Sequence, residues 1–302
     1  MYKNFNCELL GITGRQSEII ELALTYGFKG LDIDMDDFFK RCQRTSFENA
    51  ARFLLSAKLK IGGFRIPVDL DADEDAFTAA VARLNPMAEI AGRLGVKYGY
   101  ITLPNQTDRL PYHEYFEAIR QRIDQISEVL AKEEIAVALT FDPIVVEETK
   151  EFKFVRDVEG FLALVKSCKQ VGIVLDTWAW FCGGGELQHL EQIGGERVKT
   201  VWLADCAEGV SPGSATYDDC LLPGTTGVIP NAAYVKRLVE ARLSLPVSPR
   251  GKALDATITR DAFISAAQDG VNAVFAEAGL PTTVRKPELF AAPPTPAPAS
   301  SS

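Results

Sequence analysis

The chain has 302 residues, of which 47% are hydrophobic and 24% charged, an ordinary balance for a folded globular protein. This length suits one large α/β barrel of roughly 250 residues, or two smaller domains. The net charge of −9, with no block of Lys or Arg, would repel a phosphate backbone and argues against nucleic-acid binding.

The six cysteines show no CxxC spacing, so we expect reduced thiols in a chain that builds its own core. The first residues do not resemble a signal peptide, and no apolar stretch approaches the ~20 residues that span a bilayer. We therefore expect a cytoplasmic protein without membrane contact.

Short apolar runs alternate with longer amphipathic segments along most of the chain. Many of the short runs are apolar at consecutive positions, which is typical of parallel strands covered on both faces. The predicted strands are Cys7–Ile12, Gly30–Met35, Lys60–Ile66, Tyr98–Leu103, Ile135–Phe141, Gly172–Asp176, Val198–Leu203 and Leu245–Ser248. The predicted helices between them are Ser17–Tyr26, Ser46–Lys58, Ala76–Leu94, Tyr115–Lys132, Val158–Lys169 and Asn231–Ala241.

Eight strands with interleaved helices favour a closed (β/α)8 TIM barrel over residues 1–280. The alternative is an open, doubly wound sheet. Such sheets usually carry a glycine-rich turn after the first strand, and residues 10–15 lack that fingerprint. Residues 281–302 are rich in Ala, Pro and Ser, and they predict a disordered tail. Within the barrel, the Asn85-Pro86 pair predicts a kink or a break in its helix.

The active site of a TIM barrel lies at the C-terminal ends of its strands. The polar and aromatic residues at those ends are therefore the candidates for chemistry. They are Asp32, Asp34, Asp36, Arg65, Thr102, Thr140, Asp142, Asp176, Trp178, Trp180, Trp202, Asp205, Arg250 and Lys252.

Five segments of the second half follow one another in the order seen in one known family. They are residues 137–143, 174–180, 201–205, 222–229 and 246–250; the LPGxxG of 222–227 and the Asp-x-Trp-x-Trp of 176–180 are the most specific. Together they resemble the sugar phosphate isomerase/epimerase branch of the xylose isomerase-like barrels. The resemblance implies a TIM barrel of that type. By analogy with barrels that self-associate, it also suggests a homo-oligomer.

The resemblance further implies a divalent metal site, which this sequence has largely lost. Family members hold the ion with Glu, Asp, His and Glu at the ends of strands five to eight, and the two Glu residues shuttle a proton. The corresponding residues here are Thr140, Asp176, Trp202 and Arg250, so only the Asp is retained. The chain has two histidines in all, and neither falls in a predicted strand. We therefore expect no metal cofactor.

Three replacements for the ion remain open. Arg250 could pair with Asp176. A magnesium site could be rebuilt from carboxylates, namely Asp34, Asp142, Asp176 and Asp205. Alternatively, aromatic rings could line a plain pocket, namely Trp178, Trp180, Phe181, Trp202, Tyr98 and Tyr100. We interpret Asp34, with Asp32, Asp36 and Asp37, as a solvated helix-capping cluster.

The sequence thus predicts a divergent relative of the sugar isomerases that binds a small sugar, polyol or related metabolite without the metal-dependent proton shuttle. The candidate pocket residues are Arg65, Thr140, Asp142, Asp176, Trp178, Trp202, Asp205 and Arg250. The alternative is an active isomerase, epimerase or lyase, either with relocated acid/base groups such as Asp142 and Asp205 or with a rebuilt Mg/Mn site. The sequence assigns no catalytic residue and leaves open whether the protein is an enzyme. An open mouth would favour a ligand, whereas a mouth plugged by Trp178 and Trp202 would favour a scaffolding role.

Overall fold

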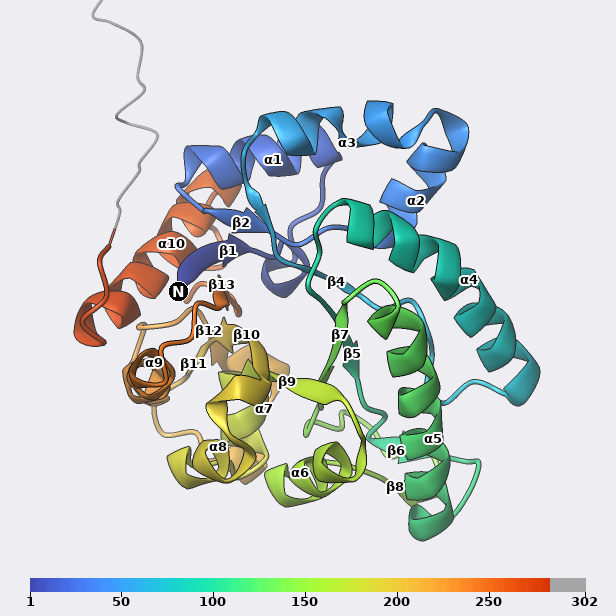
Figure 1. Cartoon of the computed structure of the whole chain (residues 1–302). Helices are drawn as coiled ribbons and strands as arrows, with labels where there is room; N and C mark the ends of the chain where they lie inside the picture. Colours follow the sequence, from blue (N-terminus) through green and yellow to red (C-terminus); the bar gives the residue numbers. More distant parts are fainter. Residues whose placement is uncertain (283–302) are drawn as a thin grey trace, which may run out of the picture.

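A computed structural model describes residues 1–282 of the chain, which form a parallel barrel surrounded by helices (Figure 1). The strands pair in the order β3-β2-β1-β13-β10-β9-β7-β5-β4. Their bounds are β1 Tyr2–Phe5, β2 Gly30–Leu31, β3 Lys60–Ile61, β4 Gly63–Arg65, β5 Tyr98–Thr102, β7 Ala136–Thr140, β9 Val171–Asp176, β10 Val198–Leu203 and β13 Pro246–Pro249. The prediction of a TIM barrel is confirmed.

The third strand is divided at Gly62, where it changes partners. Its first half, β3, pairs with β2, and its second half, β4, pairs with β5. Gly62 leaves space inside the barrel, because a Cβ there would lie 2.2 Å from Asp32 Oδ1 and 2.6 Å from Asn4 Oδ1. The absence of a side chain therefore lets two polar groups occupy the barrel interior at this point.

Ten α-helices within residues 1–282 follow or connect the strands. They are α1 Gln16–Thr25, α2 Met35–Arg44, α3 Phe47–Ser56, α4 Glu74–Arg93, α5 Tyr112–Ala131, α6 Val158–Ser167, α7 Thr177–Cys182, α8 Leu187–Ile193, α9 Asn231–Glu240 and α10 Arg260–Glu277. Two short antiparallel ribbons lie outside the barrel: β6 (Gln106–Thr107) with β8 (Phe152–Lys153), and β11 (Asp205–Cys206) with β12 (Cys220–Leu221). No helix in this part of the chain is long and apolar enough to cross a membrane.

One local prediction is wrong and another is wrong in part. The first strand is not Cys7–Ile12 but Tyr2–Phe5, and Glu8–Leu10 form a 3₁₀ turn. The segment has no run of apolar residues, because Lys3 is charged and the inward side chain Asn4 is polar, and this concealed the strand. Helix α4 runs unbroken through Pro86, so of the kink or break predicted for the Asn85-Pro86 pair, the break is wrong. The tail predicted for residues 281–302 falls almost wholly on residues 283–302, outside the described part of the chain.

The hydrophobic core lies mainly between the barrel and its helices, while a separate cluster fills the barrel itself. That inner cluster consists of Tyr98, Tyr100, Ala138, Val174 and Trp202. The aliphatic layers usual inside TIM barrels are thus partly replaced by aromatic and polar groups. The interior can therefore hold hydrogen-bond networks that an aliphatic core could not.

Gly251, two residues after the last strand, is a position where we expect a large mutational effect. Its φ is +114°, and a Cβ there would lie 2.5 Å from the backbone C and O of Leu221. Gly251→Ala should therefore destabilise the fold by about 2 kcal/mol or more. Gly213→Ala is the matched control, because its Cβ would meet nothing within 4 Å and its φ is ordinary. Urea denaturation of both variants tests this; equal stabilities would contradict it.

Candidate functional site

Asp176 and Arg250 come together at the barrel mouth, at the ends of β9 and β13. Asp176 ends β9 and is 2% exposed, whereas Arg250 follows β13 and its side chain is 20% exposed. Arg250 Nη1 contacts Asp176 Oδ2, while Asp176 Oδ1 accepts the backbone N–H of Trp178 at 3.1 Å and of Ala179 at 3.4 Å. One carboxylate therefore caps helix α7 and neutralises a guanidinium at the same time.

The residues around this pair do not fit the family's divalent ion. Thr140 Oγ1 and Trp202 Nε1 are buried and have no hydrogen-bond partner within residues 1–282. An indole N–H only donates and a guanidinium carries positive charge, so Trp202 and Arg250 cannot ligate a cation. In the described part of the chain, no group of three or more His, Cys, Asp and Glu residues is arranged to hold a metal. His189 lies in α8 and uses Nδ1 to accept the Glu186 N–H.

Asp205 anchors a loop and is not free for chemistry. It is fully buried, and its two oxygens accept backbone N–H groups 2.7–3.1 Å away from Cys206, Thr226, Gly227 and Ile229. Burial alone would raise the pKa of Asp205, but these N–H donors outweigh it and lower the pKa. The carboxylate thus holds the LPGTTG loop against the end of β10.

Asp142, Trp178 and Trp202 also pack among protein groups. Asp142, in the loop after β7, contacts the Tyr217 hydroxyl and accepts the Ile144 N–H at 3.1 Å. Trp178 lies in a buried cluster beside β11 and β12, while Trp202 packs edge-to-face on Tyr100 with ring centroids 5.0 Å apart. The structure therefore does not bring the eight predicted pocket residues into one cavity.

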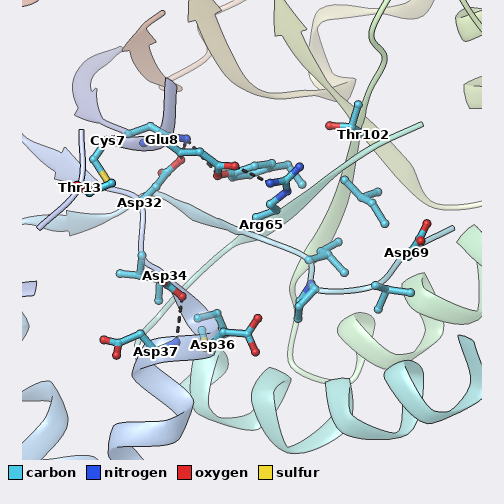
Figure 2. A pocket seen from close by; sticks show the side chains of 18 of the residues that line it. Cys7, Glu8, Thr13, Asp32, Asp34, Asp36, Asp37, Arg65, Asp69 and Thr102 are labelled. Atoms are coloured by element: carbon cyan, nitrogen blue, oxygen red, sulfur yellow. Dashed lines mark hydrogen bonds and ion pairs between the residues drawn. The ribbon is translucent and has the colours of Figure 1, made fainter. Parts of the chain in front are cut away.

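An open pocket of about 1540 Å³ lies instead over the C-terminal ends of β1, β2, β4 and β5 (Figure 2). Of the eight predicted pocket residues, Arg65 alone lines it; Thr102 also faces it. Arg65 Nη1 lies 2.6 Å from Glu8 Oε1, so this ion pair joins the segments after β1 and β4 across the pocket. The half of the mouth above the first strands is thus open, whereas Trp202 fills the barrel beside the other half.

Asp32 lies at the inner end of this pocket, and its interpretation as a solvated residue is wrong. It is 7% exposed; Oδ1 accepts from Asn4 Nδ2 and the Gly63 N–H, both at 2.8 Å, and Oδ2 accepts from Asn6 Nδ2 at 2.8 Å. Burial raises the pKa of Asp32, and the hydrogen bonds offset this only in part. Asp34, in contrast, is exposed and caps α2 through the Asp37 N–H, as predicted.

Asn6 and Tyr100 complete what we call the polar floor of the pocket, defined as Asn6, Asp32 and Tyr100. Asn6 Oδ1 accepts the N–H groups of Glu8 and Leu9, which turns its NH₂ group toward the other two floor residues. Sequence reasoning missed Asn6 because it placed the first strand too late. Once β1 is set at Tyr2–Phe5, the alternation of inward side chains predicts Asn4 and Asn6 on the barrel interior.

The family model of the xylose isomerase-like TIM barrel matches residues 20–260. The chain therefore belongs to the xylose isomerase-like TIM barrel family. No curated protein sequence matches it significantly.

Solved structures of the same fold are similar over nearly their whole length. A xylose isomerase domain protein from Alicyclobacillus acidocaldarius has a TM-score of 0.79 at 20% identity, with 92% of this chain and 99% of that chain covered. The IolI protein with a bound zinc atom has a TM-score of 0.76 at 20% identity, with coverage of 92% and 99%. D-psicose 3-epimerase, in a structure with D-fructose, has a TM-score of 0.70 at 11% identity, with coverage of 92% and 100%. These similarities establish the fold.

Proposed function

We propose that this protein is a divergent member of the sugar isomerase/epimerase-like barrels that binds a small sugar, polyol or related metabolite in the mouth pocket. In this proposal the protein does so without a bound metal and without the metal-dependent proton shuttle. The observation that carries the proposal is the contact of Arg250 with Asp176, because it sets a fixed cation against the one retained ligand. The family match and the open pocket over the ends of β1, β2, β4 and β5 support a small polar ligand.

Metal analysis tests whether the protein works without a bound metal, as the proposal states. Elemental analysis of the purified protein should find no stoichiometric metal, and Mn²⁺, Mg²⁺, Co²⁺ and Zn²⁺ should not raise the melting temperature. A specific ion with a micromolar Kd, added at millimolar concentration, would instead stabilise the fold by about 4 kcal/mol. Stoichiometric metal that disappears in Asp176→Asn would overturn the proposal.

A ligand screen tests whether the mouth pocket binds a small sugar, polyol or related metabolite. Sugars, linear polyols and cyclitols are added to the protein, and binding is followed by thermal shift and calorimetry. Thr102→Trp is the matched variant, because Thr102 is exposed and lines the pocket, so a large ring there should block a ligand without touching the core. We expect at least one compound to bind the parent protein and to lose binding in Thr102→Trp. Binding that is unaffected by this change would place the ligand elsewhere.

A further inference from the structure

The pocket carries an excess of negative charge. Seven carboxylates line it against four cationic side chains. Three of those cations are already paired with lining carboxylates: Arg41 with Asp37, Arg65 with Glu8, and Lys150 with Asp71. Asp36 is paired as well, with Arg83 from α4. Asp32, Asp34 and Asp69 remain without a cation among residues 1–282, against Arg15 as the one unpaired cation of the lining.

Asp32 is the buried member of these three carboxylates. All its hydrogen-bond donors are neutral: two asparagine amides, one backbone N–H and the Tyr98 hydroxyl at 3.4 Å. Oδ1 accepts three of these donors, whereas Oδ2 accepts one, from Asn6, and so retains a free lone pair. A buried carboxylate without a cation is costly, and a positive group reaching Oδ2 from the pocket would remove that cost.

Tyr100 supplies a second unsatisfied group at the same place. It is 5% exposed and lines the pocket, and its hydroxyl oxygen accepts from Asn6 Nδ2 at 3.2 Å. No acceptor for the Tyr100 O–H proton is found in the described part of the chain. Buried hydroxyls normally donate as well as accept. The polar floor therefore offers an anion and an unused donor side by side, both bridged by Asn6.

We propose that the ligand of this pocket is a polyhydroxylated molecule carrying a protonated amine, such as an amino sugar or an amino polyol. Its ammonium donates to Asp32 Oδ2, and one of its oxygens accepts the Tyr100 O–H proton. This inference rests on the proposed function, namely that the mouth pocket binds a small sugar or polyol. The negative lining disfavours a phosphorylated or carboxylated ligand, because its charge would be repelled where it is desolvated.

Matched probes test this inference on the unmodified protein by calorimetry. The hexose set is D-glucosamine, D-glucose and D-glucose 6-phosphate, and the linear set is glucamine, glucitol and glucitol 6-phosphate. Within each set we expect the amine to bind roughly ten- to hundredfold more tightly than the neutral compound, as for one charge-assisted buried hydrogen bond. The phosphate should bind most weakly.

Two isosteric variants locate the effect. Asp32→Asn removes the charge and should abolish the preference for the amine, while Tyr100→Phe should weaken amine and neutral compounds alike. If neutral compounds bind the parent protein as tightly as amines, or phosphates bind best, the inference is overturned while the proposed function stands. If no member of either set binds, the inference is overturned, and the wider ligand screen described above decides the proposed function. An amine preference that persists in Asp32→Asn would also overturn it, because the cation would then lie elsewhere.

Discussion

Replacing Arg250 with methionine should lower the free energy of unfolding by about 3–5 kcal/mol, because it leaves the Asp176 carboxylate buried without its cation. Methionine keeps most of the length and apolar bulk of the side chain, so the loss reports on charge rather than on a cavity. Urea denaturation at neutral pH measures the effect. The double variant Arg250→Met with Asp176→Asn should recover part of the loss, since the uncompensated charge is then gone.

Arg65→Met is the matched control for this prediction. Arg65 also pairs with a carboxylate at the barrel mouth, but the side chains of Arg65 and Glu8 are 63% and 51% exposed. Exposed pairs are screened by water and contribute little, so the stability should stay within error of the parent protein. Similar losses in both arginine variants would mean that the Arg250–Asp176 contact is not a buried ion pair in solution.

Replacing Asp205 with alanine should be similarly damaging, by about 3 kcal/mol or more. The change leaves several buried backbone N–H groups without an acceptor, each of which costs ~1–3 kcal/mol. Because those groups belong to the loop after β12, the loop should also become protease-sensitive. Asp142→Ala is the control, since its carboxylate is half-buried and accepts a single backbone N–H. Limited proteolysis and urea denaturation check both variants.

The contribution of the Asp205 carboxylate to stability should decrease in acid. The folded-state pKa of this carboxyl lies below its ordinary value of 3.8. Its stabilising contribution is therefore complete above that value and is lost as the pH falls through the lower folded-state pKa. The difference in free energy of unfolding between the parent protein and Asp205→Asn should thus be constant from pH 7 to about pH 5 and should decrease below about pH 4. A difference that increases in acid would contradict the lowered pKa of Asp205 in the folded state.

The barrel was predictable because the alternation of apolar strands with amphipathic helices is visible in short stretches of sequence. Most strands and helices follow from short apolar runs and amphipathic periods, and β10 matches its predicted bounds at both ends. The first strand was not recognised, because its inward Asn4 and Asn6 serve a network inside the barrel rather than an aliphatic layer. Helices α2, α7 and α10 were given no predicted bounds.

The candidate site was harder to predict, because it depends on which neighbours close around each side chain. Asp176, Asp205 and Asp32 all follow or end strands, yet one pairs with an arginine, one anchors a loop and one faces the pocket. Strand-end position identified them as candidates, but long-range contacts assigned their roles. The polar floor joins residues 94 positions apart, a proximity that no local pattern reveals.

Asp176 has a structural role besides any role in ligand binding. Its Oδ1 accepts two N–H groups at the start of α7, so the side chain caps this helix whether or not an ion is bound. The polar side-chain atoms of Thr140 and Trp202, at neighbouring strand ends, have no such partner among residues 1–282. A residue that caps a helix is constrained by the fold, whatever the site binds. Under the proposed function, the presence of Asp at this strand end is therefore explained by helix capping and does not by itself indicate residual catalysis.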